Sequence, residues 1–233
     1  THYFSPQQLN PLDLTPLRDI LLSQVDFDRL RRHAPVRLFV ATTEANSGKL
    51  RLFRAPELGI DALLASACLP RLHRSVMIDG QPHWDGGYAA NPAIYPLLLE
   101  CQSRETLLVM LTPLKWQQTP QSAQDIGQRT LELAFNATFL REMRMYAHLQ
   151  DSARELPWFR RGALEHRLVN TRFHLIEASQ VTSELDTQSK AAASMRFFDM
   201  LFAHGRDHAK AWLRKQRQAI GERSTVDLGA LFY

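Results

Sequence analysis

Short apolar runs separated by turn residues fill the first half of the chain, a pattern typical of strands joined by tight turns and short helices. The strands predicted in this way are Val36–Thr43, Lys49–Arg54, Val76–Ile78, a return through His83 and Trp84, Leu107–Leu111 and Phe173–Ile176. Asn46-Ser47-Gly48 is the turn between the first two. Asp79-Gly80 follows the third, and this dipeptide strongly favours a two-residue hairpin turn.

Helical spacing of apolar residues marks several segments between these strands and most of the chain after Pro120. The predicted helices are one that starts at Pro16 behind a Thr15 cap, Asp26–His33, Gly59–Cys68, Pro96–Cys101, a helix after Pro120, Asp151–His166, Lys190–His204 and Arg206–Ala219. Pro157 is expected to break the sixth of these, and Gly205 to separate the last two. The apolar stripes expected to face the core are Ile126, Leu133 and Leu140, then Phe139, Met143 and Tyr146, then Met195, Phe198 and Phe202.

The 233 residues contain no repeat, low-complexity tract or linker, so a single domain over residues 1–233 is expected. It divides into an α/β core portion at residues 1–115 and a mostly helical portion at residues 120–233. No stretch is apolar over the roughly 20 residues that a membrane helix needs. The chain opens on Thr1 without an initiating Met, and we interpret this start as a cut boundary. Cys68 and Cys101 are too few for a disulfide framework and are expected to be reduced, buried thiols of a cytoplasmic protein.

The formal net charge is +4 and the sequence pI is about 9.3, with much of the basic excess late in the chain. The late basic residues are Arg141, Arg144, Arg160, Arg161, Arg167, Arg172, Lys210, Arg214, Lys215, Arg217 and Arg223. A basic surface can attract anionic lipid headgroups or nucleic acid, and it can equally be a solvated helix face. No nucleic-acid motif accompanies the charge, so no nucleic-acid partner is expected. Peripheral contact with an anionic membrane surface stays open.

One set of motifs carries candidate chemistry. The motifs are Ala65-Ser66-Ala67-Cys68-Leu69-Pro70, Ile78-Asp79-Gly80, Trp84-Asp85-Gly86-Gly87-Tyr88 and Asn91-Pro92-Ala93. Asp85 follows a predicted strand and precedes Gly86 and Gly87, which permit positive φ and leave no Cβ in the way of a neighbour. A carboxylate at a strand end can orient a hydroxyl nucleophile or accept its proton. Taken alone, Asp85-Gly86-Gly87 would be a plain turn, as Asp79-Gly80 is expected to be.

In this order and spacing the motifs resemble the C-terminal half of the patatin-like phospholipase family. The likeness covers about half of the chain, from Val36–Arg54 to the strand at Leu107–Leu111. It implies a three-layer α/β sandwich in which helices flank a central, mostly parallel sheet. It also implies that Asp85, supported by the backbone of Gly86 and Gly87, is the aspartate of a Ser-Asp dyad. Such a dyad hydrolyses phospholipids or other fatty-acyl esters without a metal, another cofactor or a catalytic histidine.

The family places its nucleophile in a Gly-x-Ser-x-Gly elbow and its oxyanion donors in an earlier glycine-rich loop. Neither motif occurs here, because Ser47 lies in Asn-Ser-Gly-Lys, Ser66 lies in Ala-Ser-Ala-Cys, and no three glycines are consecutive. Both motifs precede the aspartate in family order, so the resemblance implies that N-terminal strands of the sandwich are missing from this chain. The chain is then expected to supply Asp85 but to be inactive alone. The alternative is a non-catalytic lipid-binding or protein-binding module that has lost its nucleophile.

Two further groups of residues could bind a ligand. His204 and His208 have the i, i+4 spacing of metal ligands on a helix. Gly205 favours a break between them and no acidic third ligand is evident, so no metal site is expected. The aromatic residues that could line an acyl-accepting groove, or simply pack in the core, are Trp116, Phe135, Phe139, Trp158, Phe159 and Trp212.

Overall fold

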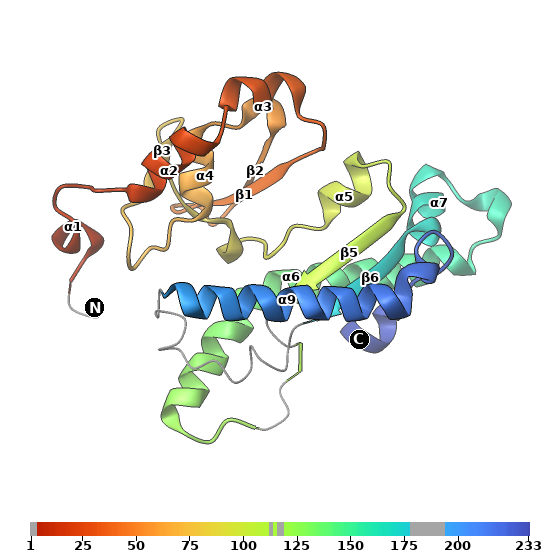
Figure 1. Ribbon diagram of the computed structural model, residues 1–233. Helices are drawn as coiled ribbons and strands as arrows, with labels where there is room; N and C mark the ends of the chain where they lie inside the picture. The colour runs from red at the N-terminus through yellow and green to blue at the C-terminus, as the bar shows by residue number, and fades with distance from the viewer. Residues whose placement is uncertain (1–3, 112–113, 116–118, 178–193) are drawn as a thin grey trace. The chain divides into compact units, whose positions relative to one another are not determined.

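The structure is a computed structural model that describes residues 4–111, 114–115, 119–177 and 194–233 (Figure 1). Within these residues the chain is a mixed α/β protein, as the apolar pattern predicts. Its strands are β1 (Phe39–Glu44), β2 (Leu50–Arg54), β3 (Val76–Ile78), β4 (Gln81–Asp85), β5 (Glu105–Met110) and β6 (Arg172–Glu177). Its α-helices are α1 (Pro6–Leu9), α2 (Pro16–Gln24), α3 (Phe27–His33), α4 (Ile60–Ser66), α5 (Tyr95–Glu100), α6 (Ala123–Glu155), α7 (Ala163–Asn170), α9 (Met195–Gln216) and α10 (Leu228–Phe232).

Two compact units make up the chain. Unit 1 comprises Thr1–Pro96 and Leu133–Glu142, and unit 2 comprises Leu97–Glu132 and Met143–Tyr233. Helix α6 contributes to both units, because its central ten residues belong to unit 1. The expectation of a single domain stays a prediction.

The strands of unit 1 form an antiparallel sheet in the order β2-β1-β4-β3. The two predicted hairpins are confirmed: β1 pairs with β2, and β3 pairs with β4. The second hairpin turns at Asp79 and Gly80, whose φ angles of 51° and 76° match the left-handed geometry that this dipeptide favours. Strand β1 begins at Phe39 rather than at Val36, and Val36 is 60% exposed. The pairing of β1 with β4 places Thr42 opposite Asp85.

Helix α4 covers one side of this sheet, where it contacts β1, β3 and β4 (Figure 1). The predicted segment Gly59–Cys68 shortens to a seven-residue helix with Gly59 at its N-cap. The buried cluster between the helix and the sheet consists of Ala62 from α4, Phe53 from β2 and Leu58 from the segment that joins them. Helix α2 starts at Pro16 as predicted, but the Thr15 side chain does not cap it, because its hydroxyl donates to the carbonyl oxygen of Asp13 instead.

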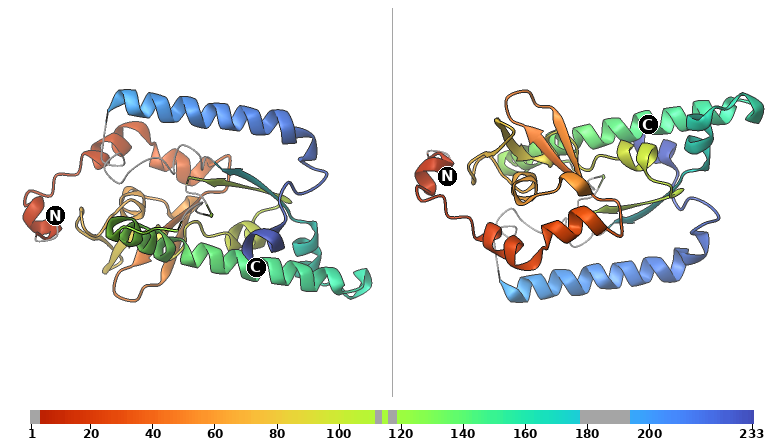
Figure 2. Two further views of the ribbon diagram at one scale, coloured as in Figure 1. Left: turned by 90° about the horizontal axis from the view of Figure 1, so that it is seen from below. Right: turned by 90° about the horizontal axis from the view of Figure 1, so that it is seen from above.

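Unit 2 contains a two-stranded parallel sheet of β5 and β6, which lie side by side in Figures 1 and 2. The outer edge of β6 is occupied, since Thr225 N donates to Phe173 O and Phe173 N donates to the Ser224 hydroxyl. One face of the pair packs on α6 through the ring contact of Phe173 with Tyr146. The predicted strands at Leu107–Leu111 and Phe173–Ile176 are therefore confirmed, each within two residues at its ends. The central, mostly parallel sheet is not formed by the described strands alone, because the larger sheet is antiparallel and the parallel one has two strands.

The helical half departs from prediction at two places. Helix α6 runs on through Asp151 to Glu155, so the predicted start of a separate helix at Asp151 is wrong. The predicted break at Pro157 is confirmed, because α6 ends before it and α7 begins only at Ala163. The predicted break at Gly205, by contrast, is wrong, because α9 is continuous from Met195 to Gln216 (Figure 2). Glycine in a helix interior costs about 1 kcal/mol relative to alanine, which the other residues of a 22-residue helix can offset. The predicted start of that helix at Lys190 lies outside the described residues. Among those that are described, no helix combines the length and the apolar character needed to cross a membrane.

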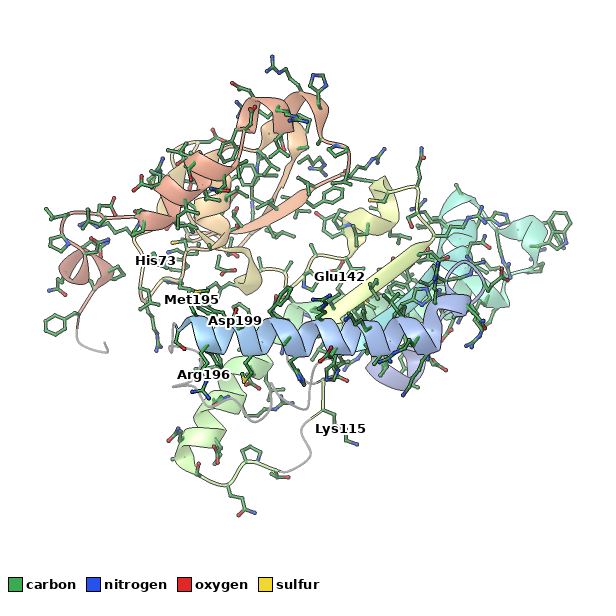
Figure 3. All side chains as sticks on the ribbon, in the orientation of Figure 1. His73, Lys115, Glu142, Met195, Arg196 and Asp199 are labelled. Atoms are coloured by element: carbon green, nitrogen blue, oxygen red, sulfur yellow. The ribbon has the colours of Figure 1, made fainter. Side chains whose placement is uncertain are left out.

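The predicted apolar stripes have different outcomes. Phe139, Met143 and Tyr146 are buried, as expected. Ile126 and Leu133 are about half exposed, at 48% and 47%. The stripe of Met195, Phe198 and Phe202 is exposed, with Met195 at 72% (Figure 3), so its placement in the core is wrong. Helix α9 instead packs on β6 through another face, on which the Trp212 ring meets His174 edge-on.

A buried polar cluster joins β5 to β6 and to the C-terminal segment of unit 2. Glu105 Oε2 lies 2.8 Å from His174 Nε2, and His174 Nδ1 lies 3.2 Å from the Thr225 hydroxyl. Arg172 donates to the other carboxylate oxygen at 2.8 Å. Burial raises the pKa of Glu105, but the hydrogen bonds from His174 and Arg172 outweigh it and leave the pKa below its ordinary value. The cluster therefore stabilises unit 2 while Glu105 is ionised.

Glu105→Ala is expected to lower the free energy of unfolding at pH 7 by about 1–3 kcal/mol, because it leaves the His174 ring nitrogen buried without a partner. The stabilisation by Glu105 is present above its ordinary pKa of 4.5 and is lost as the pH falls through the lowered folded pKa. Denaturant unfolding at pH 7 and at acid pH measures both effects. Glu222→Ala, at an exposed position, is the control. Equal stability of Glu105→Ala and the parent at pH 7 would show that the cluster contributes nothing.

Candidate active site

Asp85 is the last residue of β4, and three hydrogen bonds hold it there. Its backbone N–H donates to Cys68 O at 2.9 Å, and its carbonyl oxygen accepts from the Thr43 hydroxyl at 2.8 Å. Its carboxylate Oδ1 accepts from Gly87 N at 2.7 Å. In the described part of the chain, no hydrogen bond to its second oxygen, Oδ2, is found. One oxygen is thus fixed by the backbone while the other is available to a further group.

Gly86 and Gly87 are required by close packing rather than by positive φ. Neither glycine has a positive φ angle, although the sequence indicates that both could adopt one. A Cβ on Gly86 would lie 2.3 Å from Ala41 O, and one on Gly87 would lie 2.3 Å from Cζ of the Phe135 ring. The turn after Asp85, which forms the 3-10 helix η2 (Gly86–Tyr88), can therefore lie directly against β1 and α6.

The Asp85 side chain lines a cleft of about 250 Å³ in unit 1. The apolar lining consists of Phe39, Ala41, Leu52, Ala90, Pro92 and Ala93. Besides Asp85, the polar lining includes Ser66 and Asn91. An apolar hollow with a few polar groups is the usual composition of a small-molecule site, although this one is slightly smaller than most. The arrangement can hold a short apolar group beside a carboxylate.

Two ionisable neighbours of Asp85 are kept neutral by their surroundings. Burial raises the pKa of the Cys68 thiol, and the Asp85 charge adds to the rise. Burial and the Asp85 charge, in that order, also raise the pKa of the Tyr88 hydroxyl. The Cys68 thiol is therefore not a thiolate nucleophile at neutral pH, and the carboxylate that lines the cleft is Asp85.

His83 lies on the same strand but has a structural role. It is 3% exposed, its Nδ1 lies 2.9 Å from the Thr42 hydroxyl, and its ring meets Phe53 edge-on. Burial lowers its pKa, which favours the neutral ring. The imidazole is therefore committed to joining β1 and β4 inside the sheet.

The central part of α6 contacts the loop that follows Asp85. The Phe135 ring lies against Gly87 and meets the Tyr88 ring edge-on at 5.4 Å. About two turns further along the helix, Glu142 (labelled in Figure 3) accepts through Oε1 from Ile94 N at 2.9 Å and from Tyr95 N. Burial raises the pKa of Glu142 above its usual range, although these two N–H groups partly offset the rise. The loop is thus anchored to α6 at both ends, and it contains a cis peptide bond between Asn91 and Pro92.

The other sequence candidates fall elsewhere. Ser47 is bonded to Glu44 in the turn after β1. His204 and His208 do face each other on the continuous helix α9, with ring centroids 4.4 Å apart. Within the described ranges, no third ligand joins them and no other cluster could hold a metal.

The aromatic residues proposed for an acyl groove have different surroundings where the structure describes them. Phe135 contacts the turn after Asp85, Phe139 is buried in the core, and Trp212 packs on His174. Trp158 and Phe159 are 73% and 69% exposed in unit 2. Trp116 lies outside the described residues.

The sequence predicted no cleft or anchoring role for three residues, although two of them, Ser66 and Asn91, lie in its motifs. Ser66 lines the cleft, and its hydroxyl donates to Leu63 O within α4. Asn91 reaches the cleft from the loop, and Glu142 reaches that loop from a segment about 50 residues later. The run of small residues around Ser66 was the available hint, since small side chains permit close approach to a site.

Comparison with known proteins adds no assignment. No protein-family model, curated protein or solved structure matches the chain. The chemistry of the cleft is therefore inferred from its own residues and their geometry.

Gly86→Ala is expected to destabilise unit 1 by about 1–3 kcal/mol, because the added methyl group overlaps the Ala41 backbone, which cannot rotate away. Gly127→Ala in α6 is the matched control, since a Cβ there meets nothing and should stabilise the helix by about 0.5–1 kcal/mol. Denaturant unfolding of both variants measures the difference. If Gly86→Ala is as stable as the parent, the close contact between the turn and β1 is wrong.

Proposed function

We propose that this chain is the aspartate-bearing part of a serine-dependent lipid acyl hydrolase of the patatin type. The observation that carries the proposal is a carboxylate held by Gly87 N–H at the edge of an apolar cleft. The order and spacing of the Asp85 motif and its neighbours support it. The substrate is a phospholipid or another fatty-acyl ester, and the nucleophilic serine comes from a segment outside these residues.

The proposed reaction uses the free oxygen of Asp85 as a general base. Asp85 accepts the proton of the serine hydroxyl while the serine oxygen forms a bond to the ester carbonyl carbon. Backbone amides of the nucleophile-bearing segment stabilise the oxyanion. The alcohol leaves with a proton from Asp85, and an acyl-enzyme remains. Water then attacks the acyl carbon with Asp85 again as base, and the fatty acid and the serine are released.

The cleft residues have separate roles in this proposal. The apolar walls from Phe39 and Leu52 shield the first carbons of the acyl chain from water. Gly87 N–H neutralises part of the Asp85 charge and directs it, which leaves Oδ2 for the serine proton. No histidine is needed, in keeping with the structural role of His83.

The parallel pair in unit 2 supports a larger sandwich. Parallel sheets are normally buried on both faces. One face of β5 is nevertheless exposed: the exposed fractions are 49% for Leu107, 61% for Val109 and 71% for Leu111, which directly follows the strand. No strand pairs with the outer edge of β5 among the described residues. We propose that strands of the nucleophile-bearing segment pair with this edge and that the same segment covers the exposed face.

The proposal places the protein in the cytoplasm, in peripheral contact with an anionic membrane surface. The net charge of +4 and the basic residues late in the chain favour contact with anionic headgroups. An ester substrate in a bilayer would be reached from that surface.

Asp85→Asn is expected to lower fatty-acid release from phospholipid or p-nitrophenyl esters by about 100- to 10,000-fold, because the amide cannot accept the serine proton. The assay uses the complete protein, meaning this chain joined to the nucleophile-bearing segment. Asp79→Asn in the hairpin turn is the control and keeps the parent rate. The 233-residue chain by itself is expected to release no fatty acid.

Three results would overturn this assignment. Hydrolysis unaffected by Asp85→Asn would show that Asp85 is not the base. Hydrolysis absent from the complete protein would favour a non-catalytic lipid-binding or protein-binding module. Hydrolysis by the 233-residue chain that Ser66→Ala abolishes would instead place the nucleophile inside this chain, beside Asp85 in the cleft.

Val109→Lys tests the larger sandwich. In the complete protein it is expected to lower the free energy of unfolding by at least about 2 kcal/mol, because the ammonium group would be buried. In the 233-residue chain the position is 61% exposed, so the change should stay within about 0.5 kcal/mol. Leu164→Lys on α7 controls for a new charge at an exposed apolar position. Equal effects in the two proteins would refute the proposed covering of β5.

A further inference from the structure

We infer that Phe135 and Glu142 of α6 are positioning residues for Asp85, acting through the loop that joins them to it. This inference rests on the proposed function, because it assigns a role in the use of Asp85 as a base. It adds two residues that lie outside every motif of the aspartate segment.

Phe135 controls the start of the loop. Its Cζ atom occupies the space where a Cβ of residue 87 would lie, 2.3 Å from that position, so the ring is in direct contact with the Gly87 backbone. Gly87 N is the donor that fixes Asp85 Oδ1. Tyr88, the next residue, packs edge-on against the same ring. A shift of the Phe135 ring therefore moves the amide that directs the carboxylate.

Glu142 controls the end of the loop. Its Oε1 accepts from two consecutive backbone N–H groups, those of Ile94 and Tyr95. These two N–H groups lie at the N-terminal end of α5, where no carbonyl group of the same helix can accept from them. Ile94 is 2% exposed, so a lost acceptor would leave polar backbone atoms in an apolar environment. The Glu142 side chain is partly buried, which raises the pKa of its carboxyl group, and the two N–H donors offset part of the cost of a charge there.

The two contacts share one face of α6. Phe135, Phe139 and Glu142 have the spacing i, i+4 and i+7, and Phe139 between them is fully buried. Asn136, beside this face, is within 3.5 Å of the Asn91 side-chain amide in the middle of the loop. A rigid helix thus touches the segment from Gly86 to Tyr95 at its beginning, middle and end. The loop between these points carries Ala90, Asn91 and Pro92 into the cleft.

The contacts between α6 and the loop explain how the Asp85 carboxylate, at the start of a short turn, can keep a constant direction. On one side the backbone of Asp85 is held by Cys68, which follows α4, and by Thr43 of the neighbouring strand β1. On the other side only Gly87 directs the side chain, and Gly87 has no side chain of its own to anchor it. The α6 contacts supply that anchor, so they should affect the rate of the chemical step more than substrate binding.

The test uses the complete protein and compares Glu142→Leu with Glu142→Gln. Glu142→Leu removes the acceptor and is expected to lower kcat by about 100-fold with little change in KM, as a displacement near 1 Å at a reacting group does. Glu142→Gln keeps an acceptor oxygen and should restore most of the lost rate. Glu155→Leu, at an exposed position of the same helix, is the matched control and keeps the parent kcat.

A double-mutant cycle separates positioning from a general loss of structure. In an Asp85→Asn background, Glu142→Leu should cause no further loss of kcat, because the base that it positions is already absent. Additive losses would overturn the inference. Phe135→Leu provides a second variant should Glu142→Leu fail to fold, and the same dependence on Asp85 is expected of it.

Amide hydrogen exchange of the 233-residue chain gives a readout that is independent of activity. Faster exchange at Gly87 in Glu142→Leu than in Glu142→Gln supports transmission along the loop, and equal exchange contradicts it. A rate loss with Asp85→Asn but none with Glu142→Leu would refute only the positioning role. No loss with either variant would refute the proposed function itself.

Discussion

The site depends on close backbone packing at two consecutive residues that have no Cβ. Gly86 lies against the carbonyl group of Ala41 in β1, and Gly87 lies against the Phe135 ring. Because the turn fits between a strand and a helix, the Gly87 amide can reach back to the Asp85 carboxylate at 2.7 Å. A side chain at either position would separate these elements. Asp85 is the carboxylate that lines the cleft among the described residues. Its side chain can take this direction because residues 86 and 87 have no Cβ atom.

The polar residues buried in the two units have distinct functions. His83 and His174 are both almost fully buried, and each one joins neighbouring segments through a hydroxyl group. Glu142 and Glu105 are carboxylates that accept hydrogen bonds from groups held in place by the fold. Asp85 differs from them because it lines the cleft, where its Oδ2 accepts no hydrogen bond from the described residues. This difference, rather than the residue type, marks it as the candidate base.

The exposed apolar surface is consistent with the same assignment. Strand β5 has an apolar face with half-exposed residues and an edge that no described strand occupies. The cleft beside Asp85 has apolar walls and a carboxylate, and the Ser66 hydroxyl that also lines it donates to Leu63 O. In the proposed function, an additional segment that supplies strands and a serine accounts for both features.

The sequence by itself determined the hairpins, the positions of most strands and the placement of Asp85 at a strand end. These features depend on local rules, such as the left-handed turn at Asp79 and Gly80 and the conformational limits of proline. Tertiary structure alone decided that Gly86 and Gly87 serve close packing, that α9 continues through Gly205 and that Glu142 anchors the loop. It also decided which apolar stripes are buried, since periodicity identifies a face but not what covers it. The reason is physical: contacts between residues about 50 positions apart arise only when the chain has folded.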